Sequence, residues 1–77
     1  MSIVASAIFR ADGTVMCARA YVPRPRAAIV SLIDTAGRRA RASGQAQGSI
    51  WLEDHIALYQ VVQEQVYMIV AEEAANI

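Results

Sequence analysis

A segment that is apolar on both sides of a strand most constrains how this chain can fold. Residues 65–71 read QVYMIVA, a length and composition typical of a β-strand. Successive side chains of a strand point to opposite faces, and both sets are apolar here: Val66, Met68 and Val70 on one face, Tyr67, Ile69 and Ala71 on the other. Such a strand is typical of a sheet that is covered on both sides. The sequence therefore predicts a sheet that needs two covering layers, within 77 residues.

The N-terminal part predicts a β-hairpin. Residues 3–10 and 14–22 are apolar runs of strand length, and Asp12-Gly13 lies between them. An Asp-Gly pair between such runs favours a tight turn, because glycine tolerates the positive φ that the turn needs. In the first strand, strict alternation places Val4 and Ile8 on one face, opposite a second apolar set formed by Ile3, Ala5, Ala7 and Phe9. This strand too is expected to need cover on both faces.

One amphipathic helix is predicted to follow. Pro23 and Pro25 end the second strand and can open a helix, since a proline in the first turn loses no intrahelical hydrogen bond. A single apolar stripe then recurs at helical spacing: Ile29, Leu32, Ile33 and Ala36. Gly37 weakens the last turn, and Gly44 closes the region before a loop over residues 43–49.

Three further strands complete the expected fold. They cover residues 50–54, 55–62 and 65–71, with polar breaks around Glu53-Asp54 and Gln63-Glu64-Gln65. The order β-β-α-β-β-β predicts an α+β domain, residues 1–77, with a five-stranded, mostly antiparallel sheet and one helix on one face. The other face is left without local cover, so a partner or further chain is expected there.

Composition narrows the classes of partner. Seven arginines balance seven acidic residues, so the net charge of zero gives no general attraction to nucleic acid or to an anionic membrane. A single cysteine forms no intramolecular disulfide, which fits a reducing compartment. No apolar run approaches the roughly 20 residues that span a bilayer. We therefore expect a soluble, cytoplasmic protein.

The residues offer no convincing catalytic, metal or cofactor site. Cys17 and His55 could act as a nucleophile and a base if the fold joined them, but a strand cysteine is more often a small buried hydrophobe and His55 falls in a turn. The acids at Glu53 and Asp54 are adjacent to His55 rather than spaced for metal ligation. No glycine-rich nucleotide-binding motif is present. We predict that the protein is not an enzyme and binds no cofactor.

Candidate interaction residues fall into three groups. A basic cluster of Arg38, Arg39 and Arg41, with Arg24 and Arg26, could meet an acidic partner or, weakly, phosphoinositide headgroups, or could simply be a solvated helix end. Trp51 opens an expected edge strand, where it could serve an interface or fill the core. Val4 and Ile8 are expected on the uncovered face.

The sequence resembles the longin domain of trafficking proteins, and most closely the N-terminal domain of the coatomer delta subunit, a medium-type adaptor subunit. The resemblance is carried by IVASAIFRADGTVMCARAYV at residues 3–22 and LYQVVQEQVYMIVAEEAANI at residues 58–77. It implies a five-stranded sheet with the first helix on one face and two C-terminal helices on the other. Asn76-Ile77 would begin the second helix, so the resemblance implies a longin-like domain that stops before its C-terminal helices.

The same resemblance implies a function. Such domains are non-catalytic subunits that dock onto the helical-solenoid subunits of a vesicle coat, which implies Golgi-to-endoplasmic-reticulum retrograde transport and a cytoplasmic protein peripheral on Golgi or vesicle membranes. An alternative is a small structural subunit of an unrelated large assembly, recruited through its exposed sheet face. No nucleic-acid partner is expected in either case.

Overall fold

The computed structural model describes residues 2–72, which form one sheet and one helix. The elements, in chain order, are β1 (Ser2–Arg10), β2 (Val15–Ala20), α1 (Arg26–Ser43), β3 (Gln47–Leu52), β4 (His55–Val62) and β5 (Gln65–Glu72). The predicted β-β-α-β-β-β order is confirmed. Residues 73–77, which include the expected Asn76-Ile77 helix start, lie outside the described residues.

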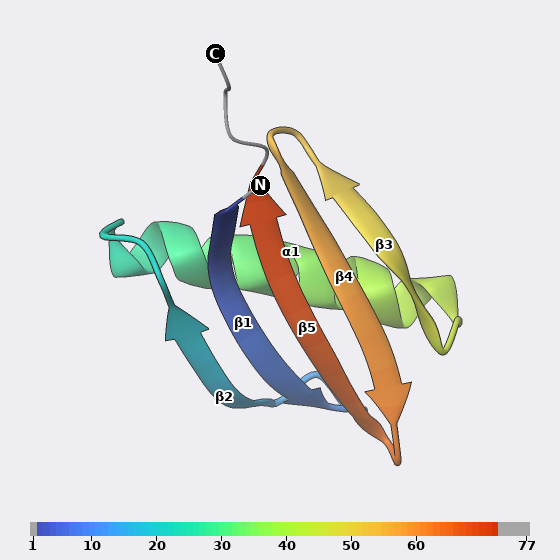
Figure 1. Ribbon diagram of the computed structural model, residues 1–77. Helices are drawn as coiled ribbons and strands as arrows, with labels where there is room; N and C mark the ends of the chain where they lie inside the picture. The colour runs from blue at the N-terminus through green and yellow to red at the C-terminus, as the bar shows by residue number, and fades with distance from the viewer. Residues whose placement is uncertain (1, 73–77) are drawn as a thin grey trace.

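The sheet has the order β2-β1-β5-β4-β3, and every neighbouring pair is antiparallel (Figure 1). Three of these pairs are joined by short turns. By contrast, β1 and β5 pair with each other although they are the first and the last strand in the sequence. The two strands that the sequence shows as apolar on both faces therefore lie in the middle of the sheet. Both edges, β2 and β3, are more polar or more exposed.

The β1–β2 turn forms as the Asp-Gly pair predicts. Gly13 has φ +96°, and its N–H donates to the carbonyl of Arg10 at 2.9 Å. The N–H of Thr14 donates to the Asp12 carboxylate at 2.8 Å, and this hydrogen bond is the main reason that the pKa of Asp12 is lowered. The turn residues thus satisfy their own polar groups locally.

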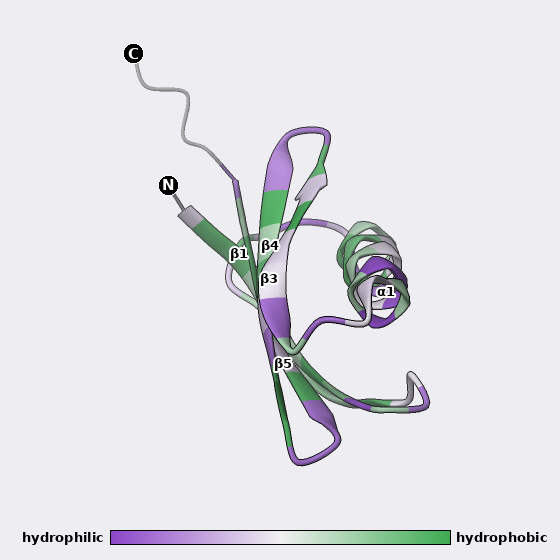
Figure 2. Cartoon of the chain, turned by 90° about the vertical axis from the view of Figure 1, so that its right-hand side faces the viewer, coloured by the Kyte–Doolittle hydropathy of each residue, from purple (hydrophilic) through white to green (hydrophobic). Residues whose placement is uncertain are grey.

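The helix α1 covers one face of the sheet, and no other helix within residues 2–72 covers the opposite face (Figure 2). Pro25 precedes its first residue, and Gly44 ends it in a left-handed conformation with φ +68°. The buried positions recur at helical spacing: Ile29, Ile33, Ala36, Gly37 and Ala40. Leu32 was predicted on the same stripe but lies at its margin, partly exposed. No helix within residues 2–72 is long and apolar enough to cross a bilayer.

Gly37 has a packing role that the sequence did not suggest. A Cβ at this position would lie 2.8 Å from Cζ of Phe9, whose side chain is almost completely buried. Real Cβ atoms do not approach a ring so closely, so the absence of a side chain at Gly37 lets α1 sit directly on Phe9. Phe9 and the buried apolar residues of α1 belong to one hydrophobic core.

Two expectations about the strands were wrong. The pairing of β1 with β5 shifts between Ile3 and Ala5, and this bulge turns Val4 into the core with no exposed surface, rather than onto the uncovered face. Ile3, expected in the core, is half exposed instead. In addition, β3 begins at Gln47, inside the stretch predicted as a loop, because Gln47 and Gly48 pair with β4.

Candidate interaction surface

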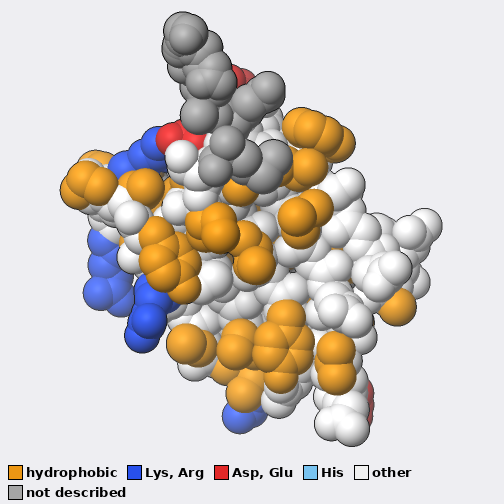
Figure 3. All heavy atoms as spheres, in the orientation of Figure 1, with side chains coloured by type: hydrophobic (Ala, Val, Ile, Leu, Met, Phe, Trp, Pro, Cys, Tyr) orange, Lys and Arg blue, Asp and Glu red, His pale blue; other side chains and the backbone are white. Residues whose placement is uncertain are grey.

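The sheet face opposite α1 is apolar and uncovered by the residues that the structure describes. Cross-strand pairing carries one row from Leu58 through Ile69 to Ser6, and a second row from Gln60 through Tyr67 to Ile8 and on to Cys17. Leu58, Tyr67 and Ile69 keep 47%, 43% and 44% of their surface exposed. Figure 3 views this face and shows hydrophobic side chains spread across its middle. We call it the open face.

A shallow groove of about 470 Å³ lies between these two rows and crosses four strands, from β4 to β2. Its lining includes residues of both rows: Ser6, Ile8, Cys17, Leu58, Gln60, Tyr67 and Ile69. The walls are mainly apolar, and the polar groups are small hydroxyls and one amide. The Ser6 hydroxyl lies 3.1 Å from the Tyr21 hydroxyl.

The structure places both Ile8 and Trp51 on the open face. This position was expected for Ile8, whereas for Trp51 the sequence allowed either an interface or the core. Ile8 lines the groove and is partly buried by its neighbours. Trp51 lies on the edge strand β3, pairs with Ile56, and is 69% exposed, so it does not fill the core. A tryptophan this exposed on an apolar face is typical of a contact site for another molecule. Val4 is excluded from the surface by the bulge described above.

The predicted arginine cluster does not form a single basic patch. Arg38 pairs with Asp34 one turn away at 3.2 Å, and Arg39 donates to the backbone carbonyl of Trp51 at 3.0 Å. Arg41 lies beside Gly13 of the β1–β2 turn, where its guanidinium would meet a Cβ at 2.9 Å. The three side chains therefore turn to three different places, and they do not converge on a common anion.

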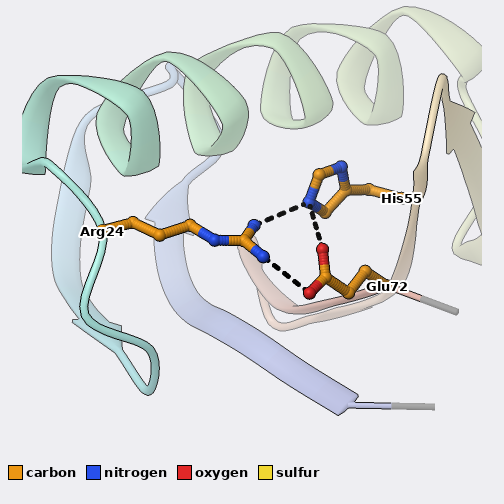
Figure 4. A network of polar contacts seen from close by, with 3 residues as sticks. All are labelled: Arg24, His55 and Glu72. Atoms are coloured by element: carbon orange, nitrogen blue, oxygen red, sulfur yellow. Dashed lines mark hydrogen bonds and ion pairs between the residues drawn. The ribbon is translucent and has the colours of Figure 1, made fainter. Parts of the chain in front are cut away.

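A polar cluster that sequence reasoning missed joins three segments at one end of the sheet (Figure 4). Arg24, in the β2–α1 linker, donates to the Glu72 carboxylate at 2.6 Å and lies 3.2 Å from Nε2 of His55. The same His55 nitrogen lies 3.5 Å from the other Glu72 oxygen. The Arg24 hydrogen bond is the main cause that lowers the pKa of Glu72 and raises that of Arg24.

This cluster ties the linker to the sheet and separates the two residues of the conceivable catalytic pair. His55 pairs with Leu52, which is buried on the helix side, whereas Cys17 lines the groove on the open face. The sheet lies between them, so they do not act together. Among residues 2–72 no cluster of metal-ligating side chains is found. Only the cross-strand register brings His55 beside Glu72, so no local sequence signal could have revealed the cluster.

Comparison with known proteins gives the fold. No protein-family model matches the sequence. No curated protein matches it significantly either. Among solved structures, that of MglC from Myxococcus xanthus, a protein of roadblock/longin-like fold, matches over 96% of this chain and 70% of the MglC chain, with a TM-score of 0.57 and 12% sequence identity. The fold is longin-like. At this identity the likeness concerns the fold, and it gives no support to the coatomer delta subunit in particular.

Proposed function

We propose that this protein is a non-catalytic interaction module that binds a protein partner through the open face. The observation that carries the proposal is the set of half-exposed apolar side chains in the middle of the sheet, Leu58, Ile69 and Tyr67. A contiguous apolar surface of this kind is rare on monomers and typical of binding sites. The separation of Cys17 from His55 further favours binding over catalysis.

A finer proposal names the assembly. The resemblance of residues 3–22 and 58–77 to the coatomer delta subunit supports a subunit of a coatomer-like vesicle coat, cytoplasmic and peripheral on Golgi or vesicle membranes, in retrograde transport to the endoplasmic reticulum. The partners would then be helical-solenoid coat subunits. The alternative is a small structural subunit of an unrelated assembly that uses the same open face, and the longin-like fold is compatible with either.

Capture of partners from the native cell tests both proposals: binding through the open face and the identity of the assembly. The tagged wild-type chain is compared with Ile69→Lys, which puts a charge in the middle of the open face, and with Val30→Lys, which changes a similarly exposed position on the helix. We expect specific partners with the wild type and Val30→Lys, and their loss with Ile69→Lys. Partners that are solenoid coat subunits support the coat assignment, and subunits of another assembly support the alternative. If Ile69→Lys keeps every partner, the open face is not the binding surface.

A further inference from the structure

The groove on the open face is long enough to hold a short helix. It crosses four strands, β4, β5, β1 and β2, and neighbouring strands lie about 4.8 Å apart, so its length is about 14 Å. A helix rises 1.5 Å per residue, so roughly ten residues, close to three turns, would span the groove. The two walls, formed by the Leu58–Ile69–Ser6 and Gln60–Tyr67–Ile8 rows, would hold one apolar stripe between them.

Backbone chemistry selects a helix over an extended peptide. The interior of a sheet face presents side chains, because the N–H and C=O groups of β1, β5 and β4 are used by their neighbours. An extended segment lying across that face would bury backbone groups without partners, which costs free energy for each group. A helix satisfies its own backbone and offers only side chains to the groove.

Charge then selects the kind of helix. At the strand positions that face the open side, the charged residues within the described chain are Arg10 and Arg19, both basic. Arg19 continues the row of Leu58, Ile69 and Ser6 onto β2, so it lies at one end of the groove. Within residues 2–72, the strands of a second copy of this chain would bring no acidic side chain to Arg19 on the open face, because Asp12 and Glu64 lie in turns beside Arg10. A partner with acidic side chains would pair with Arg19 instead.

We infer that the open-face groove binds an amphipathic helix of about three turns whose apolar stripe fills the groove and whose acidic residues lie over β2, next to Arg19. This inference rests on the proposed function and specifies the partner segment. Arg19 favours a partner helix with acidic side chains, and the apolar rows provide the contact area.

A pair of synthetic helices tests the inference on the full chain. One peptide of about 12 residues, held helical by a side-chain bridge, carries a Leu stripe and Glu residues beside it, and the second has Lys in place of Glu. Binding is followed by the fluorescence of Trp51 and by the alkylation rate of Cys17, the single cysteine, which lines the groove. We expect the Glu peptide to bind at least about threefold more tightly than the Lys peptide and to slow alkylation of Cys17.

Charge exchange provides the matched control. Arg19→Glu is expected to reverse the preference between the two peptides, whereas Arg38→Glu, the same change of charge on the helix, is expected to leave it unchanged. Restored binding of the Lys peptide also shows that Arg19→Glu folds. Equal affinity for both peptides, an unchanged preference in Arg19→Glu, or no binding at about 1 mM would overturn the inference. If native partners are nonetheless lost with Ile69→Lys, the proposed function stands and only the helical, acidic partner is wrong.

Discussion

The two faces of the sheet are built from the same strands but differ in burial. Along β5, Val66, Met68 and Val70 are buried beneath α1, whereas Tyr67 and Ile69 on the other side keep more than two fifths of their surface exposed. Both sets are apolar, so hydrophobicity alone does not distinguish a core from an interface. What differs is fit, since Gly37 and the alanines of α1 bring the helix into direct contact with one face. The open face has the composition of a core and the exposure of a binding site.

The difference between the two faces is expected to be largest when one aromatic ring is removed from each. Phe9→Ala removes the largest fully buried side chain of the covered core and is expected to lower the free energy of unfolding by about 3–5 kcal/mol. Tyr67→Ala, on the adjacent strand but on the open face, is expected to cost less than about 1 kcal/mol. Chemical denaturation of both variants measures this. Equal losses would show that the open face is already packed in the free chain.

The contact between helix and sheet can be tested at Gly37. Alanine is usually favoured over glycine in a helix by about 1 kcal/mol, yet a methyl group here would meet the Phe9 ring at 2.8 Å. Overpacking of about 1–3 kcal/mol should outweigh that gain, so Gly37→Ala is expected to destabilise by about 1 kcal/mol. Thermal unfolding of Gly37→Ala, with and without Phe9→Leu, measures the coupling. A stabilised Gly37→Ala protein would contradict the close approach.

A substitution in the β4–β5 turn, outside both faces, serves as a control for the substitutions on the sheet. The β4–β5 turn places Gln63 and Glu64 at positive φ, +50° and +67°, where residues with a Cβ are strained. Glu64→Gly should relieve this strain and stabilise the chain by about 0.5–1 kcal/mol. Denaturation together with binding of a hydrophobic dye measures it: stability should rise while dye binding stays the same. A change in dye binding would show that the turn influences the open face.

The smallest expected effect is a pH dependence at the linker. The pKa of Glu72 is lowered from its ordinary value of 4.5, chiefly by the Arg24 hydrogen bond. The unfolded chain therefore takes up the Glu72 proton at a higher pH than the folded chain does. The stabilisation is complete above about pH 4.5 and is lost as pH falls through the lowered pKa. Unfolding of wild type and Glu72→Gln between about pH 3 and 6 measures it. Parallel curves would argue against the ion pair.

Local signals in the sequence predicted most of the fold. Asp12-Gly13 located the first hairpin, and the double apolar pattern of residues 65–71, together with a single predicted helix, predicted that one apolar sheet face has no local cover. Features that depend on non-local geometry were missed. The bulge that buries Val4 arises from pairing with β5, more than 60 residues away, and alternation alone placed that side chain on the wrong face. Likewise, the Arg24–His55–Glu72 cluster exists only once three distant segments meet.

The candidate surface was predicted in outline rather than in detail. Alternation correctly separated Tyr67 and Ile69 from Val66, Met68 and Val70, and it correctly assigned Ile8 to the uncovered face. The arginines of the helix were grouped by their spacing in the sequence, but their side chains turn to different partners. Where a long side chain points is decided by the neighbours it meets in the fold, and spacing along the chain does not contain that information.

The central claim is that the open face of the folded chain is an exposed apolar surface. The most direct measurement combines hydrophobic-dye fluorescence with sedimentation of the wild type and Ile69→Lys at micromolar concentration. We predict that the folded wild type binds the dye or self-associates, and that Ile69→Lys, placed in the middle of the open face, loses that behaviour while keeping its thermal transition. A wild-type chain that sediments as a stable monomer and binds no dye would contradict the account.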